Sequence, residues 1–253
     1  MVLKESIYYT PAAEDRTLHI YLPDDYYDTA EHYPVMYFWD GHNLYFDSDA
    51  TYGKSWGLKD FLDSWVKKLI VVGIECSHAG THRLDEYCPY DSELMGTKIH
   101  GEGKETMDWM VSVLKPYVDG RFRTLPSRET TAIGGSSMGG LMSLYAVTMY
   151  NEVYSRAACV SPSLMIVEDP LRSEISARGL DANTRIYLSW GNKEGGDDPN
   201  SPFAQYVSAV NRNMQSFLCS KGVLTSLYMQ DGGRHCEADW EKQLPVFMNY
   251  LWA

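Results

Sequence analysis

Ser137 stands in a glycine-rich stretch, residues 134–140, that reads GGSSMGG. Residues 129–133 before it predict a short buried strand, and residues 141–150 after it predict a helix. A serine between small residues, after a strand and before a helix, is typical of a nucleophile elbow, in which a sharp turn exposes the hydroxyl. The stretch lacks the three-glycine spacing of a dinucleotide site and the lysine of a P-loop. We therefore expect Ser137 to be a nucleophile.

A serine hydroxyl needs a base to take its proton and a third group to orient that base. On the fold built around such an elbow, the acid follows the serine in the chain and the histidine comes last. His235, in a loop at residues 231–237, is the one histidine after Ser137, since the other six precede it. We expect His235 to be the base.

The acid should follow the apolar strand that ends near Trp190. Glu194, Asp197 and Asp198 all lie in the loop that begins there, at residues 191–198. Glu194 is closest to the strand end, so it is the first candidate. The two aspartates are alternatives, although solvated or helix-capping roles are common for such residues.

Acyl transfer also needs two hydrogen-bond donors aimed at the developing oxyanion. The backbone amide of Met138, directly after the nucleophile, should supply one. The second should come from the loop after the predicted strand 34–39, where we assign the amide of His42, with Gly41 as the close alternative.

The elements that must position these residues alternate along the chain. An alternating segment at 5–22 places Leu18, Ile20 and Leu22 on one strand face. Further apolar runs predict buried strands at 33–39, 68–74, 131–133, 157–160, 185–190 and 224–229. Helical patterns lie at 56–66, 104–118, 139–150, 202–221 and 239–252. This alternation predicts an α/β protein with a mostly parallel sheet and helices on both faces, formed as one domain over residues 1–253.

The overall charge limits the kinds of partner. The chain has 22 basic and 34 acidic residues, a net charge of −12, which argues against nucleic acids and anionic membranes. No apolar stretch approaches 18 residues, and the N-terminus lacks a signal-peptide pattern. Five irregularly spaced cysteines suit a reducing compartment. We expect a cytoplasmic protein; its oligomeric state has no signal in the sequence.

Two weaker signals concern binding. Cys76, His78, His82 and Cys88 have the residue types of a zinc site, but the segment reads as a loop, where a four-residue spacing gives no shared face. We therefore expect no metal and no organic cofactor.

Arg83 and Trp56 are candidate substrate-binding residues. Arg83 has the planar fork to grip an anionic group, or it anchors its own loop through Asp85, Glu86 or a backbone carbonyl. Trp56 is a candidate for an acyl pocket, with ordinary packing as the alternative.

Taken together, these segments resemble the putative-esterase family of α/β-hydrolases, which includes enterochelin esterases, S-formylglutathione hydrolases, mycolyltransferases and feruloyl or acetylxylan esterases. The resemblance is carried by residues 33–43, 83–89, 134–140, 161–163, 191–194 and 232–235, followed by Trp240. It implies an α/β-hydrolase fold with Ser137, His235 and an acid at Glu194, where relatives often have Asp. It also implies oxyanion amides at His42 and Met138.

The expected activity is carboxylic-ester hydrolysis through an acyl-enzyme. The substrate class implied by the resemblance is a small-molecule ester: a siderophore, a sugar-linked ester or a small intracellular ester. The predicted strand that ends at 160 and the one that begins at 185 are only 25 positions apart in the sequence, so no large lid is expected. Two alternatives remain: acyl transfer to an alcohol acceptor, and a binding protein that keeps the fold without chemistry.

Overall fold

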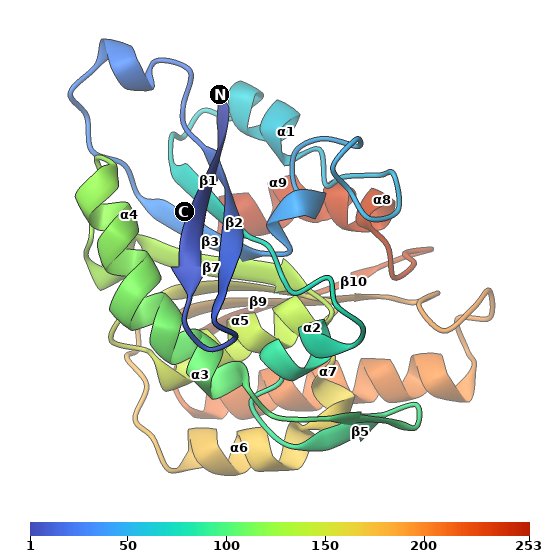
Figure 1. The fold of residues 1–253 in the computed structure, drawn as a ribbon. Coiled ribbons are helices and arrows are strands. Elements are labelled where there is room, and N and C mark those ends of the chain that lie inside the picture. Colours follow the sequence, from blue (N-terminus) through green and yellow to red (C-terminus); the bar gives the residue numbers. More distant parts are fainter.

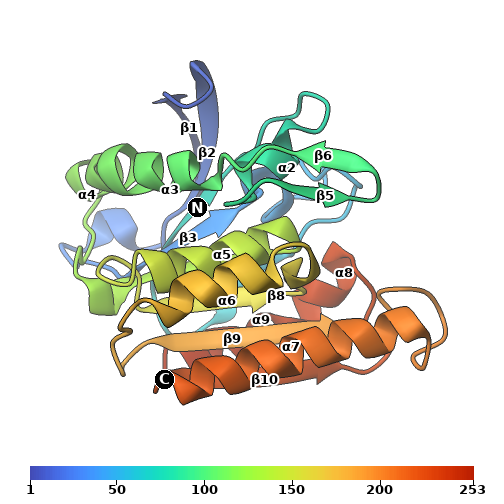
Figure 2. The same ribbon diagram turned by 90° about the horizontal axis from the view of Figure 1, so that it is seen from below.

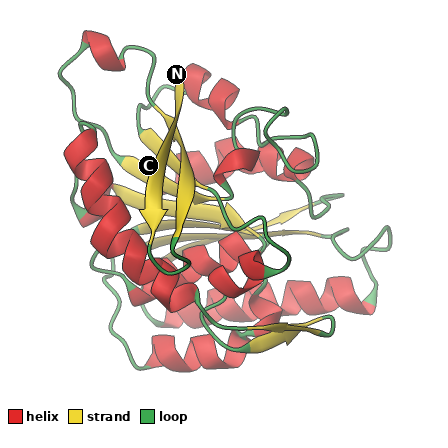
Figure 3. Ribbon diagram, in the orientation of Figure 1, coloured by secondary structure: helices red, strands yellow, loops and turns green.

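An eight-stranded sheet runs through the computed structural model, which describes all residues from 1 to 253. Its helices cover both faces (Figures 1 and 3). The strands of this sheet are β1 (Val2–Tyr9), β2 (Glu14–Tyr21), β3 (Val35–Trp39), β4 (Ile70–Ile74), β7 (Thr131–Ser136), β8 (Arg156–Val160), β9 (Arg185–Gly191) and β10 (Leu224–Gln230). A separate two-stranded hairpin consists of β5 (Ser92–Leu94) and β6 (Thr97–Ile99).

The strand order is β1-β2-β4-β3-β7-β8-β9-β10. All pairs from β4 to β10 are parallel, whereas β1 and β2 are antiparallel to their neighbours. The carboxyl ends of the six parallel strands therefore share one edge, where ligands bind in open α/β sheets. The mostly parallel sheet of the sequence analysis is confirmed.

Alternate side chains of each strand enter two different hydrophobic cores. In β3, Val35, Tyr37 and Trp39 join the larger core, whereas Met36 and Phe38 join the smaller one. All five are buried. A strand that is covered on both faces must be apolar throughout, which is why this segment reads as a continuous apolar run.

Two sets of helices cover the two faces. Buried residues of α3, α5, α6 and α7 belong to the larger core, and those of α1 and α9 to the smaller one. Figure 2 shows α5, α6 and α7 side by side along one face of the sheet. The helices are α1 (Leu58–Ser64), α2 (His82–Glu86), α3 (Gly103–Trp109), α4 (Lys115–Arg121), α5 (Met138–Met149), α6 (Glu168–Ser176), α7 (Pro202–Ser220), α8 (Glu237–Trp240) and α9 (Leu244–Leu251).

Several predicted elements differ in detail. The segment 5–22 forms parts of two antiparallel strands, because the chain turns between Tyr9 and Glu14. The predicted helix 104–118 is α3 and α4 joined by a π-helical turn, Met110–Leu114, and the predicted helix 239–252 is divided between α8 and α9. Helix α6 lies in the segment between β8 and β9, residues 161–184, and was not predicted. No helix has the length and apolar character needed to cross a membrane.

Candidate active site

Ser137 occupies the one-residue turn between β7 and α5. Its backbone has φ 58° and ψ −122°, a conformation that costs a non-glycine residue on the order of 1–3 kcal/mol. Three backbone hydrogen bonds hold it there. The Ser137 amide donates to Val160 O (3.0 Å), and the Ser137 carbonyl accepts from Leu141 (3.0 Å) and Ser163 (3.1 Å). The strained turn is thus fixed by the neighbouring strand and the helix.

Glycines are required on both sides of this turn. A Cβ on Gly135 would lie 2.8 Å from Trp39 Cδ1 and 2.9 Å from the Gly139 carbonyl carbon. A Cβ on Gly139 would lie 2.8 Å from Trp39 Cβ. Strand β7 and helix α5 can therefore pack closely only because these positions lack side chains, which explains the glycine-rich sequence around the serine.

His235 and Glu194 meet in the loops after β10 and β9. Nδ1 of His235 lies 3.0 Å from Glu194 Oε2. The other carboxylate oxygen, Oε1, accepts hydrogen bonds from the Gly191 amide (2.7 Å) and from Ser161 Oγ (2.5 Å). Trp240 Nε1 donates to the same Ser161 hydroxyl (3.0 Å). Glu194 is 8% exposed and His235 36%, so the buried carboxylate holds a histidine that reaches solvent.

The two loops are in direct backbone contact. A Cβ on Gly191 would lie 2.2 Å from Gly233 O, and the Lys193 amide donates to that oxygen (2.9 Å). Asn192 adds side-chain hydrogen bonds to Asp231 (2.8 Å) and from the Gly232 amide (2.7 Å). The position of Glu194 relative to His235 is therefore set by contacts beside the pair as well as by the pair itself.

The two alternative acids lie elsewhere. Asp197 forms an exposed ion pair with Arg234 (2.5 Å). Asp198 accepts a hydrogen bond from the Asn200 amide (2.9 Å) within its own loop. Neither aspartate contacts His235, whereas Glu194 does.

Ser137 and His235 line the same cavity, which has a volume of about 580 Å³. The Ser137 hydroxyl makes its one side-chain hydrogen bond to Ser163 Oγ, at 3.4 Å, and makes none to His235. Catalytic hydrogen bonds are often long or misaligned before substrate binds.

The two expected oxyanion donors lie in the first turns of helical segments. Met138 is the first residue of α5, where the backbone amides have no partner within the helix. His42 lies in the 3₁₀ turn Gly41–Asn43, directly after β3. A Cβ on Gly41 would lie 2.5 Å from the Gly73 carbonyl carbon, so this turn packs tightly against β4. Both segments thus start at the carboxyl edge of neighbouring strands.

Arg83 is anchored by a residue outside its own loop. Its guanidinium forms two 2.7 Å hydrogen bonds to the carboxylate of Asp40. Asp85 and Glu86, the expected partners, instead accept from the His100 amide and from Arg16. The expected partners are wrong because Asp40, which follows β3 with a left-handed backbone (φ 56°), lies next to helix α2, which carries Arg83. Arg83 also lines the cavity, and its role in substrate binding stays a prediction.

Asp40 is nearly fully buried by this arrangement. Burial acts to raise the pKa of its carboxyl, but the charge and hydrogen bonds of Arg83, with smaller contributions from His42 and Cys76, together lower the pKa to below its ordinary value. The carboxylate is therefore ionised and paired at neutral pH.

Comparison with known proteins identifies the family. The sequence profile of the family described as "Putative esterase" matches residues 11–251, nearly the whole chain. The chain belongs to this esterase family. The protein is accordingly a carboxylic-ester hydrolase.

Relatives of this esterase are distant in sequence. An uncharacterized protein of Bacillus subtilis, YbbA, is 23% identical over 186 residues, which are 72% of this chain and 70% of that protein. An esterase of Mycobacterium tuberculosis is 27% identical over 147 residues, which are 58% of this chain. The match covers 29% of the mycobacterial protein, so most of that protein has no counterpart here.

Solved structures share the fold of this esterase. An IroE-like serine hydrolase of Shewanella oneidensis superposes with a TM-score of 0.77 at 19% identity, covering 99% of this chain and 79% of that one. The enterobactin esterase FES of Shigella flexneri gives 0.72 at 18% identity, covering 100% of this chain and 58% of that one. A ferulic acid esterase of Anaeromyces mucronatus gives 0.66 at 19% identity, with 98% and 88% covered. These likenesses establish the α/β-hydrolase fold.

Trp56 does not reach the cavity of this esterase. Its side chain is 2% exposed and stacks on Trp240, with ring centroids 5.7 Å apart. It also packs edge-on against Phe38 (5.2 Å). Trp240 lines the cavity, so Trp56 supports the cavity wall from behind. The surroundings of Trp56 therefore fit the alternative interpretation, in which its side chain only packs.

Several polar residues around the site were not given roles from the sequence. Ser161 links Glu194 to Trp240, and Ser163 holds the Ser137 hydroxyl. Both belong to the segment 161–163 that carries the family resemblance, and that match was the signal available. Glu237 lines the cavity and is 8% exposed, and burial raises the pKa of its carboxyl. No sequence pattern pointed to Glu237.

Proposed function

We propose that this esterase is a serine hydrolase in which Ser137, His235 and Glu194 form a catalytic triad. The observation that carries the proposal is the 3.0 Å contact between His235 Nδ1 and Glu194 Oε2, in a cavity that also contains Ser137. With Nδ1 donating to the carboxylate, Nε2 is the nitrogen free to take the serine proton. Glu194 is in turn oriented by hydrogen bonds from Ser161, in the segment after β8, and from the Gly191 amide at the end of β9.

The proposed reaction has two halves. His235 takes the Ser137 proton while the serine oxygen bonds to the ester carbonyl carbon, and the amides of Met138 and His42 stabilise the oxyanion. The tetrahedral intermediate collapses, the bond to the alkoxide breaks, and His235 returns the proton to the leaving alcohol. Water then attacks the acyl-enzyme with the same base, which releases the acid and restores Ser137. Glu194 stabilises the protonated imidazole in each half.

The character of the cavity favours a small polar ester. Only four of its sixteen lining residues are hydrophobic, which suits a short or oxygen-rich acyl group better than a long alkyl chain. The names of two structural neighbours, an enterobactin esterase and a ferulic acid esterase, describe esters of this kind. Siderophore, sugar-linked and small metabolic esters all fit this class.

The test is hydrolysis of p-nitrophenyl esters from acetyl to decanoyl. We expect turnover that is fastest for the shortest acyl groups and that falls by on the order of 10⁴-fold or more in Ser137→Ala. Ser112→Ala, an exposed serine on a distant helical turn, is the matched control and should keep full activity. Undiminished hydrolysis by purified, folded Ser137→Ala would overturn the proposal.

A further inference from the structure

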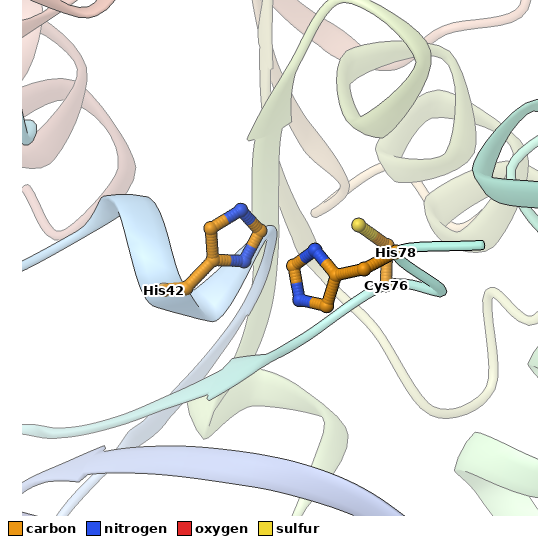
Figure 4. A group of neighbouring side chains, drawn as sticks. All are labelled: His42, Cys76 and His78. Atoms are coloured by element: carbon orange, nitrogen blue, oxygen red, sulfur yellow. The ribbon is translucent and has the colours of Figure 1, made fainter. Parts of the chain in front are cut away.

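Three side chains that the proposed reaction does not use converge on one part of the cavity wall: His42, Cys76 and His78 (Figure 4). One potential ligand atom from each lies within 4.8 Å of the other two. His42 comes from the turn after β3, whereas Cys76 and His78 come from the loop after β4. His42 and Cys76 are buried, and His78 is exposed.

His42 presents a ring nitrogen that has no partner. Its Nε2 lies 2.9 Å from Thr51 Oγ1, which occupies that nitrogen. Its Nδ1 makes no hydrogen bond, and because the residue is only 7% exposed, this nitrogen is also buried away from solvent. Buried polar atoms without partners are rare, and each one calls for an explanation. The ring lies against His78, with centroids 4.8 Å apart (Figure 4).

His78 is oriented in a similar way. Its Nε2 lies 3.2 Å from Glu75 Oε2, and the other oxygen of Glu75 lies 2.6 Å from His19 Nε2. Each of the two cavity histidines therefore has its Nε2 held by an oxygen, which leaves Nδ1 for another ligand. Histidines that bind metals are oriented by such a second hydrogen bond, often to a carboxylate.

The donor set indicates which metal fits. Two imidazoles and a thiol are ligands for borderline-soft ions such as Zn²⁺, whereas Ca²⁺ and Mg²⁺ require oxygen. Bonds of about 2.0–2.3 Å in a tetrahedral site place ligand atoms roughly 3.3–3.8 Å apart. The three atoms must therefore approach by about 1 Å, and the exposed His78 has the freedom to do so.

We propose that His42 Nδ1, Cys76 Sγ and His78 Nδ1 bind Zn²⁺, and that the bound ion reversibly inhibits the esterase. Cys76 loses its proton to solvent as the zinc–sulfur bond forms. Three protein ligands leave the fourth position open to the cavity that Ser137 shares, so the ion and its water occupy space that the substrate needs. The proposed inhibition rests on the proposed function, whereas the proposed zinc binding does not.

The binding test is equilibrium dialysis of metal-stripped protein against buffered Zn²⁺. We expect one ion per chain, and a loss of affinity of at least about 10- to 100-fold in Cys76→Ser and in His78→Ala. The matched controls are Cys219→Ser and His82→Ala, an exposed cysteine outside the cavity and an exposed histidine at the start of α2, and both should bind normally. Loading with Co²⁺ should give a thiolate-to-cobalt charge-transfer band that is absent in Cys76→Ser.

The outcomes separate the two proposals. Equal Zn²⁺ affinity in Cys76→Ser, or no charge-transfer band with Co²⁺, overturns the zinc site. Dialysis with Ser137→Ala gives the same binding result without any activity, so a failed esterase assay leaves the zinc test intact. Zinc binding that depends on Cys76 but does not reduce ester hydrolysis overturns the proposed inhibition alone.

Discussion

Two parts of the cavity wall are built in different ways. The catalytic wall, named for the proposed triad, consists of Ser137 and His235, with Glu194 behind them, and its loops follow β7, β9 and β10. Hydrogen bonds and a close backbone contact at Gly191 hold it together. The loop wall consists of Asp40, His42, Cys76, His78 and Arg83, and its loops follow β3 and β4. One buried ion pair joins those two loops.

The side chains of the catalytic wall are thus arranged for the proposed reaction, whereas those of the loop wall support the cavity and are available to bind ligands. On the catalytic wall, both oxygens of the Glu194 carboxylate have partners, so the histidine is oriented before substrate arrives. On the loop wall, the Asp40–Arg83 pair fixes the backbone, while the Nδ1 of His42 has no partner and burial raises the pKa of the Cys76 thiol. Changes to the first wall should therefore reduce turnover, whereas changes to the second should mainly alter stability and ligand binding.

Removal of the base should have the largest effect. In His235→Ala we expect kcat to fall by on the order of 10⁴-fold or more, with little change in thermal stability, because the side chain is 36% exposed. Steady-state kinetics with p-nitrophenyl acetate and a melting curve measure both. The exposed His32→Ala is the control. A mutant that keeps a tenth of the activity would remove His235 from the catalytic wall.

The acid should come next. Glu194→Gln keeps the shape of the side chain but removes the charge that holds the imidazole, so we expect kcat to fall by about 10²- to 10⁴-fold. Asp197→Asn breaks only an exposed ion pair and should leave kcat within about 2-fold. Side-by-side kinetics of the two variants decide the assignment, and the reverse ranking would transfer the role to Asp197.

A backbone change can test the contact between the two catalytic loops. In Gly191→Ala the new Cβ would lie 2.2 Å from Gly233 O, so the loops that carry Glu194 and His235 must separate. A displacement of about 1 Å can cost about 100-fold in rate, and we expect a fall of that order in kcat. Gly120→Ala, where a Cβ meets nothing within 4 Å, is the matched control. Normal kcat in Gly191→Ala would show that the backbone contact is dispensable.

The ion pair of the loop wall should affect stability. Arg83→Met leaves the buried Asp40 carboxylate without its partner, and we expect the free energy of unfolding to fall by about 2–3 kcal/mol. This is less than the loss of a fully buried partner would cost, because the Arg83 side chain is 30% exposed and solvent screens part of its charge. Urea unfolding measures it. Arg234→Met, which removes the exposed partner of Asp197, should cost less than about 1 kcal/mol.

The same variant has a defined pH dependence. Because Arg83 lowers the pKa of Asp40, the pair contributes stability above the ordinary carboxyl pKa of about 3.9, and this contribution disappears as the pH falls through the lowered value. The unfolding free energies of wild type and Arg83→Met should therefore converge as the pH falls below about 4. A difference that stays constant down to pH 2 would mean that Arg83 stabilises through packing instead.

The sequence was most informative where a residue's role could be inferred from its neighbours and from its order along the chain. Ser137 could be proposed as the nucleophile because a sharp strand-to-helix turn requires glycines, and His235 could be proposed as the base because it is the one histidine that follows Ser137 in the chain. The partner of Arg83 could not be predicted, since Asp40 is distant along the chain and nearer carboxylates were available. The proximity of His42 to Cys76 and His78 could not be predicted either. Spacing within a loop does not show which side chains point the same way, and His42 comes from a different segment, the turn after β3.

Local requirements of backbone and burial were therefore determined by the sequence itself: apolar strands covered on both faces, glycines at the elbow, and the order of nucleophile, acid and base. Only the tertiary structure decided which loops contact one another. The parallel sheet brings the ends of β3, β4, β7, β9 and β10 to one edge, and contacts there depend on side-chain reach and backbone approach in three dimensions. No one-dimensional pattern encodes those distances, so the ion pair and the histidine–cysteine cluster became visible only in the folded chain.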